Sequence, residues 1–182
     1  MGLESGGSFL GYPFCQLTGL GGTAEVGASC FLLQVDGKNI LLDAGVRVNR
    51  SGKESLPDLG KLGEMVDNLD LVLVSHAHMD HTGALPLILE MFPQVKIYCT
   101  KATKAITSIL LRDAVKIMTY GAEEGEDEVL YDNDDIDRLL WVMVGVEKSK
   151  WHELIDGVWV NFHPCGHVLG ASSILLLSLI HI

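Results

Sequence analysis

The sequence predicts a mixed α/β protein in which helices cover β-sheets, and two observations lead to this fold class. Short apolar runs rich in valine and leucine alternate with segments whose apolar residues recur at helical spacing, in the order strands, helix, strand, helix, strand, helix, helix, strands. In addition, histidines follow directly on the ends of two apolar runs, which is where open α/β sheets hold ligands.

The first half of the chain is expected to contain a strand hairpin followed by alternating helices and strands. Asp36-Gly37 lies between two apolar runs and is a strong hairpin signal. A glycine-rich stretch before it lacks the Gly-Lys-Ser/Thr of a phosphate-binding loop. In order, we expect a loose segment at 1–13, a strand beginning at 15–18, a glycine-rich loop at 19–27, strands at 30–35 and 39–42, a polar loop at 47–55, a helix at 57–66, a strand at 70–74 and a helix at 83–92.

The second half is expected to carry two helices between strands. Thr100 is a favourable N-cap for the first helix, and Asn133 or Asp134 for the second. Asn161 and His163 are expected to point outward from a later strand. In order, we expect a strand at 95–99, a helix at 101–118, a helix from 133 or 134 to about 143, and strands at 144–146, 158–162 and 172–178. The apolar side of the first helix is expected to hold Ala105, Ile106, Ile109, Leu110 and Ile117.

Length and composition indicate one soluble domain. The chain has 182 residues and a hydrophobic fraction of 48%, which is ample for a core. Its formal net charge of −11 is unfavourable for holding a polyanion unaided, and its lysines and arginines form no evident stripe. The acidic residues concentrate at 123–137, which we expect to be a solvated loop and a helix start. With no signal peptide and no membrane-spanning run, we expect a cytoplasmic protein, or a nuclear one in a eukaryote.

The segment Ser75–Gly83 predicts a metal site. His76, His78, Asp80 and His81 lie within six residues, directly after an apolar run. Imidazole and carboxylate groups are zinc ligands, so a cluster this dense is suited to a pair of ions. His76 and His78 are two residues apart and point the same way if the segment is extended, whereas Asp80 and His81 project differently and could serve a second ion. The alternative is a group of solvated loop histidines.

A second segment, at residues 166–171, strengthens this interpretation. His167 follows a strand end, and the glycines around it would let backbone approach a metal closely. Cys165 could touch a metal, but we favour a small buried thiol there. The other cysteines form no Cys-x-x-Cys or disulfide pattern, and Cys30 and Cys99 are expected in the core. Two further histidines, His152 and His163, match no metal motif and are taken as ordinary polar residues.

Four segments together resemble the metallo-β-lactamase fold superfamily and, within it, the β-CASP RNA-processing nucleases, such as the cleavage and polyadenylation endonuclease and RNase J. They are residues 22–30, 42–45, 75–86 and 166–171, and the resemblance runs from about residue 16 to 178. It implies an αββα sandwich, incomplete at its C-terminus. Residues 14–182 would be the N-terminal part of the domain, ending before a bridging aspartate and the β-CASP domain.

The resemblance also implies roles for individual residues. His76, His78 and His167 would bind one zinc ion, and Asp80 and His81 would bind the other and act in catalysis. Asp43 would brace the ligand loop, although a carboxylate that caps a turn is equally compatible with its place at a strand end. Glu25 lies in a loop that the family places near the site, and its role stays open.

The implied activity is cleavage of RNA phosphodiester bonds, internally or from an end, by a metal-activated hydroxide. RNA would bind through the complete protein, as a homo-oligomer or within an RNA-processing complex, and no membrane partner is expected. Three alternatives remain open: a thioesterase or lactonase of the same fold, a non-catalytic scaffold or binding subunit, and a fragment that is inactive by itself.

Overall fold

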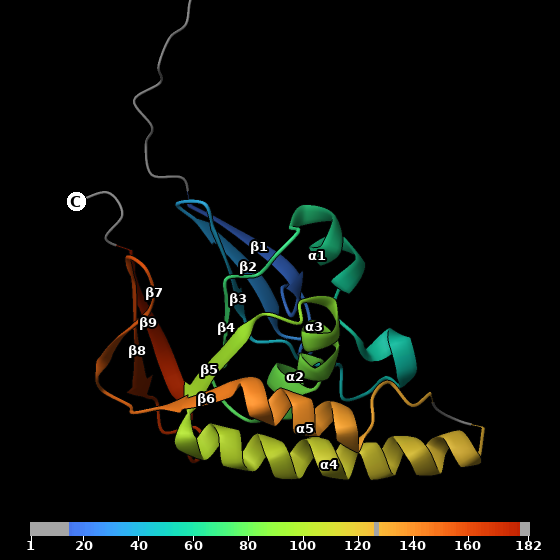
Figure 1. Ribbon diagram of the computed structural model, residues 1–182. Helices are drawn as coiled ribbons and strands as arrows, with labels where there is room; N and C mark the ends of the chain where they lie inside the picture. The colour runs from blue at the N-terminus through green and yellow to red at the C-terminus, as the bar shows by residue number, and fades with distance from the viewer. Residues whose placement is uncertain (1–14, 126–127, 179–182) are drawn as a thin grey trace, which may run out of the picture.

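The computed structural model describes residues 15–125 and 128–178, so the segment expected to be loose at 1–13 lies outside the described residues. Figure 1 shows two β-sheets with helices gathered on one side. The larger sheet has six strands in the order β1 (Cys15–Gly21), β2 (Cys30–Val35), β3 (Lys38–Leu42), β4 (Leu71–Leu73), β5 (Lys96–Thr100) and β6 (Met143–Val146). The smaller sheet has three strands in the order β7 (Trp151–Ile155), β8 (Val158–Pro164) and β9 (Ser172–Ser178).

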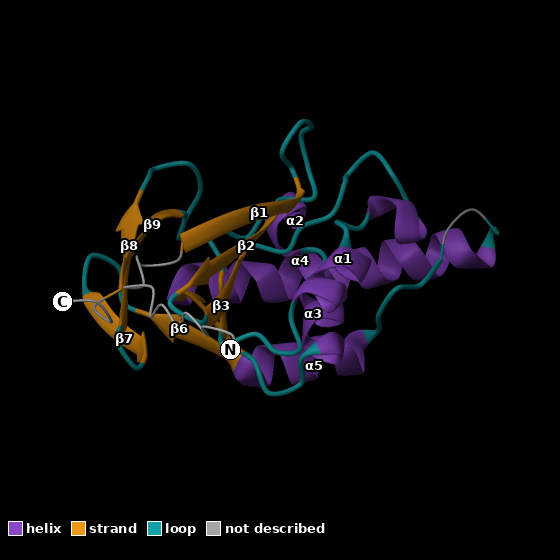
Figure 2. Cartoon of the chain, turned by 90° about the horizontal axis from the view of Figure 1, so that it is seen from above, coloured by secondary structure: helices purple, strands orange, loops and turns teal. Residues whose placement is uncertain are grey.

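The helices complete a layered arrangement of helices, large sheet and small sheet. They are a 3₁₀ turn, η1 (Gly52–Ser55), and the α-helices α1 (Leu59–Met65), α2 (Met79–Thr82), α3 (Leu85–Met91), α4 (Lys101–Glu123) and α5 (Asn133–Val142). The view from above shows α1, α3, α4 and α5 on one side of the large sheet and β7–β9 on the other (Figure 2). The predicted mixed α/β class is therefore confirmed. Within the described residues no helix is both long and apolar enough to cross a membrane.

Strand direction brings the functional segments to one edge of the large sheet. β1, β2 and β3 pair antiparallel, whereas β3, β4, β5 and β6 pair parallel. Leu42 of β3 lies beside Leu73 of β4, so the residues that follow both strands emerge at the same edge. Asp43 and the segment starting at Ser75 are therefore neighbours, as the carboxyl ends of parallel strands are expected to be.

Two apolar cores hold the layers together. The larger lies between the helices and the large sheet and includes Leu32, Val72 and Ile88. The smaller lies between the two sheets, where Leu71 and Leu73 of β4 meet Phe162 of β8. Since β4 contributes to both cores, its residues are apolar on both faces, which explains its unbroken Leu-Val-Leu sequence.

The prediction for the buried face of α4 is wrong. Ile109 and Ile117 are 68% and 65% exposed, whereas the buried residues are Thr103, Thr107, Leu111 and Val115. The Thr100 side chain caps the helix as predicted, by accepting a hydrogen bond from the Thr103 N–H. The Thr103 hydroxyl hydrogen-bonds on the buried side of the helix, and a periodicity argument that counts only apolar residues does not include threonine.

Smaller differences also have physical reasons. Asp132 caps α5 in a reciprocal capping box with Asp135, one residue before the predicted cap. Asn161 is 8% exposed, not outward in solvent, because it lies opposite Trp151 on the neighbouring strand. The strand β7 was not predicted, β1 continues into the expected glycine-rich loop as far as Gly21, and the expected polar loop contains η1.

Candidate metal centre

The candidate ligands come from two segments that are far apart in the sequence. The motif segment, residues 75–83, leaves the end of β4 and includes α2, so Asp80 and His81 lie on a short helix and not on a plain turn. His78 is the N-cap residue of that helix. The His167 segment, residues 165–171, connects β8 to β9. Strand ends from both sheets thus contribute to one site.

Three imidazoles meet where the two segments face each other. The possible ligand atoms of His76, His78 and His167 all lie within 4.8 Å of one another. The ring of His167 is 5.0 Å from each of the other two rings, centroid to centroid, and its Nε2 is 3.3 Å from Nδ1 of His78. Residues 89 positions apart are therefore brought together, as the sequence led us to expect.

A second group of possible ligands lies beside the first. His76, Asp80 and His81 also place one ligand atom each within 4.8 Å of the others. The Oδ2 atom of Asp80 is 3.6 Å from Nε2 of His81. The second group expected from the sequence contained only Asp80 and His81, so the sharing of His76 between both groups is a feature that sequence reasoning missed.

Asp43 links the end of β3 to the motif segment. Its Oδ1 accepts a hydrogen bond from the Ser75 N–H at 2.7 Å, and its Oδ2 accepts one from the Ser75 hydroxyl at 2.7 Å. The same Oδ2 is 2.8 Å from Nδ1 of His81, which leaves Nε2 of that ring on the side of Asp80. Asp43 has φ +57, a left-handed conformation that aspartate tolerates better than most residues. Its contacts match both expectations, because the carboxylate caps a turn and also orients the histidine ring.

Burial and neighbouring charge set the protonation of two of the rings. Burial, the repulsion of His81 and the other nearby imidazoles lower the pKa of His76 to about 4, although Asp43 opposes this. His76 is therefore neutral near pH 7, the form that can ligate a metal. Burial also lowers the pKa of His81, but the hydrogen bond and charge of Asp43, with the charge of Asp80, outweigh it and raise that pKa.

Main-chain hydrogen bonds fix the motif segment against the end of β3. The Ala44 N–H donates to the His81 carbonyl at 2.9 Å, and the Val46 N–H donates to the Met79 carbonyl at 3.0 Å. Gly45 lies between them, and a Cβ added there would be 1.7 Å from the Asp80 carbonyl oxygen. Only glycine permits this approach, which gives a physical reason for the Asp43-Ala44-Gly45 sequence.

Two threonines hold the His167 segment. The hydroxyls of Thr100 and Thr103 both donate to the Gly170 carbonyl, at 2.9 and 3.0 Å. Gly170 has φ +88, and a Cβ there would lie 2.7 Å from the Thr103 backbone nitrogen. The Ser172 N–H donates to the Ser75 carbonyl at 3.0 Å, which ties the two segments together. Sequence reasoning found Thr100 as a cap but missed this second contact.

Other residues singled out from the sequence lie outside the two ligand groups. Glu25 forms an ion pair with Arg47, at 2.6 Å from its guanidinium. Cys165 is exposed, so the prediction of a buried thiol is wrong; the segment there curves over the surface before β9 begins. Cys30 and Cys99 are buried, as predicted.

The donor set fits a divalent transition metal. Three imidazoles and a carboxylate–imidazole pair are the ligand types that zinc takes. His76 is buried whereas His167 is exposed, so the cluster opens to solvent on one side. Such an opening would let a substrate reach the centre.

Sequence comparison agrees with this chemistry. A model of the metallo-β-lactamase superfamily matches residues 23–168. Cleavage and polyadenylation specificity factor subunit 3 of Dictyostelium discoideum is 35% identical over 164 residues, covering 88% of this chain and 20% of the relative. Endoribonuclease YSH1 of Saccharomyces cerevisiae is 35% identical over 160 residues, covering 84% of this chain and 20% of the relative. The chain therefore spans about a fifth of the length of these relatives.

Solved structures show the same fold. A metallo-β-lactamase superfamily protein from the archaeon Sulfolobus tokodaii superposes with a TM-score of 0.57 at 20% identity, covering 90% of this chain and 61% of that one. A protein of unknown function from Enterococcus faecalis superposes with a TM-score of 0.60 at 20% identity, covering 91% of this chain and 41% of that one.

Proposed function

Because this chain belongs to the metallo-β-lactamase superfamily, we propose that it carries the metal centre of a zinc-dependent enzyme that hydrolyses RNA phosphodiester bonds. The observation that carries the proposal is the convergence of His76, His78 and His167 from two distant segments. Imidazoles this close repel one another when protonated, which favours the neutral form that can bind a cation.

The chain's own side chains would have distinct roles at this centre. His76, His78 and His167 would hold one zinc ion, and Asp80 and His81 would hold a second. Zinc lowers the pKa of a bound water and offsets charge that develops on a phosphate group. Asp43 would keep Nε2 of His81 directed toward Asp80 by accepting from Nδ1. The exposed side, at His167, would admit the phosphodiester.

The RNA substrate is inferred from the relatives. Proteins named as endoribonucleases or as cleavage and polyadenylation factors are 32–37% identical to this chain. The histidine–aspartate motif is common to the superfamily, so the thioesterase or lactonase alternative is a matter for experiment. We further propose that the protein acts within an RNA-processing complex, in the nucleus if its source is eukaryotic.

Zinc content tests the metal centre. The chain is dialysed against a zinc buffer and its bound zinc is measured by mass spectrometry. We expect the double variant His76→Ala, His78→Ala to lose most of its zinc because it removes two of the three ligands proposed for the first ion. His163→Ala removes an exposed histidine outside both groups and should leave the content unchanged. Equal zinc in all three proteins would refute the ligand assignment.

Substrate choice is tested with the full-length gene product. The protein is incubated with a labelled single-stranded RNA and, separately, with a thioester, in zinc and in chelator. We expect zinc-dependent cleavage of RNA that is lost in His167→Ala. Turnover of the thioester alone would favour the other hydrolase class, and zinc binding without turnover of either would favour the scaffold alternative.

A further inference from the structure

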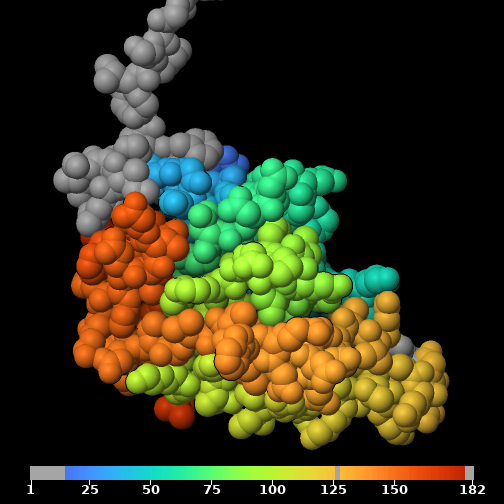
Figure 3. Space-filling view, viewed as in Figure 1, coloured from blue at the N-terminus to red at the C-terminus, as the bar shows by residue number. Residues whose placement is uncertain are grey.

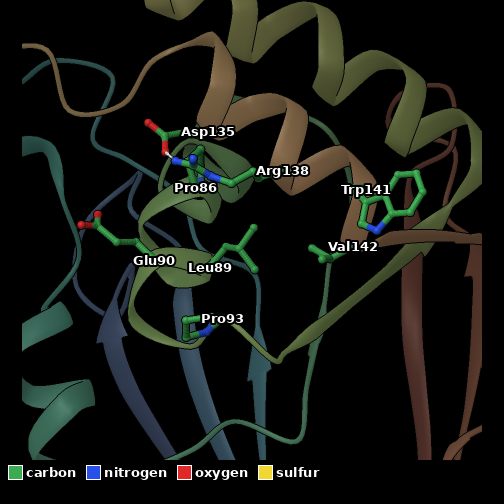
Figure 4. Close-up of a pocket in the computed structure, with 8 residues that line it drawn as sticks. All are labelled: Pro86, Leu89, Glu90, Pro93, Asp135, Arg138, Trp141 and Val142. Atoms are coloured by element: carbon green, nitrogen blue, oxygen red, sulfur yellow. Dashed lines mark hydrogen bonds and ion pairs between the residues drawn. The ribbon is translucent and has the colours of Figure 1, made fainter.

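Three surface pockets are candidates for contact with a substrate. The first, of about 390 Å³, lies between α3 and α5 and is lined by Pro86, Leu89 and Trp141 (Figure 4). Trp141 is 89% exposed, and the charged residues at this pocket include Glu90 and an Asp135–Arg138 ion pair. Its lining includes none of the candidate ligands, and nothing in the structure indicates what would cover it.

The second pocket, of about 230 Å³, lies between the 46–55 region and α4. It contains arginines, but their charges are already compensated. Arg47 pairs with Glu25 at 2.6 Å, and Arg50 pairs with Glu54 at 3.5 Å. A phosphate approaching this pocket would have to compete with carboxylates for each cation.

The third pocket, of about 360 Å³, adjoins the His167 segment. Lys101 from the start of α4, Lys148 from the turn after β6, and Leu169 and Gly170 from the His167 segment line it. Figure 1 shows the red segment between β8 and β9 passing beside the start of α4 and the end of β6. The same three parts of the chain meet at the lower left of the space-filling view (Figure 3).

The charge at this third pocket is positive. Among the described residues, neither Lys101 nor Lys148 lies in an ion pair within 4.0 Å. Glu147 is the nearby carboxylate, and Lys150 forms an ion pair with it. The hydrogen bond and charge of Lys150, and then the charge of Lys101, lower the pKa of Glu147. Glu147 lines the pocket together with Lys101 and Lys148, so two lysines face one carboxylate and the lining keeps a net charge of +1 in a chain of net charge −11.

The apolar part of the pocket has a complementary role. Leu169 is 75% exposed and stands two residues after His167. Two residues span at most about 7 Å, so Leu169 lies close enough to contact a nucleotide next to one held at His167. Lys101 and Lys148 line the same pocket as Leu169. Ammonium groups suit phosphates, and an exposed leucine suits the face of a base or sugar.

We propose that this third pocket is a binding subsite for the sugar–phosphate backbone of single-stranded RNA, next to the phosphodiester that is cut. The inference rests on the proposed function, because it assumes that RNA reaches the cluster at His167. Lys101 and Lys148 would contact phosphates, and Leu169 would pack against the adjoining nucleoside. The acidic remainder of the surface would discourage binding elsewhere.

Salt-dependent binding tests the lysines. A fluorescent oligouridylate of about ten nucleotides is titrated with the full chain in chelator, so that no cleavage occurs, at several salt concentrations. In Lys101→Gln, Lys148→Gln the slope of log K against log salt should fall by about 1.4, because each phosphate contact on a single strand contributes about 0.7. The matched control is Lys61→Gln, Lys96→Gln, which removes the same charge from exposed lysines elsewhere.

Leu169→Ser tests the apolar contact independently of the lysines. The side chain is exposed, so its replacement should not affect folding. RNA affinity should fall by about threefold with no change in the salt slope, because an apolar contact and not a charge is lost. Equal weakening by both lysine pairs, or no detectable RNA binding by the unmodified chain at low salt, would overturn the subsite. So would an equal effect of Lys101 and Lys148 on heparin binding, which would indicate a general polyanion surface.

Zinc content separates this inference from the one on which it rests. Lys101→Gln, Lys148→Gln should keep the zinc content of the unmodified chain, since neither lysine is a candidate ligand. Normal zinc with unaltered RNA binding would reject the subsite and leave the metal centre standing. Zinc that does not depend on His76 and His78 would reject the metal centre, whatever the lysine variants show.

Discussion

The two segments that form the candidate metal centre are anchored in different ways. The motif segment is held by main-chain hydrogen bonds to the end of β3 and by the buried carboxylate of Asp43. The His167 segment is exposed at residues 165–167 and is held by two threonine hydroxyls at Gly170 and by the hydrogen bond from the Ser172 N–H to the Ser75 carbonyl. One half of the site is therefore part of the core, whereas the other is held mainly at its C-terminal end.

This difference predicts unequal responses to substitution. Changes behind the motif segment should destabilise the whole chain, because its backbone is continuous with the large sheet. Changes behind the His167 segment should weaken metal binding more than they weaken folding, since few buried atoms depend on that segment. Four substitutions test this contrast.

Gly45→Ala should have the largest effect on folding. A Cβ at this position would lie 1.7 Å from the Asp80 carbonyl oxygen, so the motif segment would have to move away from β3. We expect a loss of about 4 kcal/mol or more in the free energy of unfolding, measured by urea denaturation in chelator. Gly37→Ala is the control, because nothing lies within 4 Å of a Cβ at Gly37, and its positive φ alone should cost about 1 kcal/mol. Similar losses for both would contradict the main-chain anchoring.

Asp43→Asn should have the next largest effect. Asparagine keeps the shape and tolerates positive φ, but it cannot accept from Ser75 and His81 as a carboxylate does. We expect about 2 kcal/mol of destabilisation and a 10- to 100-fold loss of zinc affinity, measured by chelator competition. Unchanged zinc affinity would mean that Asp43 only caps the turn.

Gly170→Ala should perturb the His167 segment with a smaller cost in folding. The added methyl would approach Thr103 at 2.7 Å, and the residue would keep an unfavourable φ of +88. We expect about 2 kcal/mol of destabilisation and a clear loss of zinc. Gly166→Ala shares the positive φ in the same segment, but nothing lies within 4 Å of its Cβ. If it matches Gly170→Ala in both measurements, the threonine contact has no special role.

Thr103→Val should have the smallest effect on folding. It removes one of the two hydroxyls that hold Gly170 and keeps the side-chain shape, so we expect about 1 kcal/mol and a zinc affinity about tenfold lower. Thr107→Val is the matched control on the same buried face. The Thr107 hydroxyl is buried and has no hydrogen-bond partner among the described residues, so its removal should be neutral or stabilising. A zinc affinity that stays unchanged in Thr103→Val would show that Thr100 holds the segment alone.

The elements that could be predicted from the sequence are those with their own local signals. β2 and β9 were predicted to the residue, because each is an apolar run that follows a glycine-containing loop. β7 was missed because its sequence, Trp-His-Glu-Leu-Ile, lacks the strict alternation of polar and apolar residues that marks a half-buried strand, and the strand gains its stability from pairing with β8. The exposed isoleucines of α4 misled the periodicity argument, since Thr103 is buried for its hydroxyl contact and not for its apolarity.

The candidate site also has features that can be read from the sequence and features that depend on the three-dimensional packing. The residue types of His76, His78, Asp80 and His81 are readable as a motif, and their grouping with His167 agrees with the resemblance on which it was expected. The sharing of His76 between two groups and the close approach at Gly45 depend on three-dimensional packing, which no spacing within one segment specifies. The two lysines at the third pocket come from separate parts of the chain, the start of α4 and the turn after β6, so they are far apart in the sequence.

The main-chain anchoring of the motif segment has a practical consequence for protein engineering. Its course is set by carbonyls and amides from Ala44 to Val46, and these remain when a ligand side chain is exchanged. A thiolate could therefore be installed at His78 to favour a softer ion such as copper(I), with the loop retaining its path. Each ligand side chain could then be replaced singly without a change in the backbone that carries it.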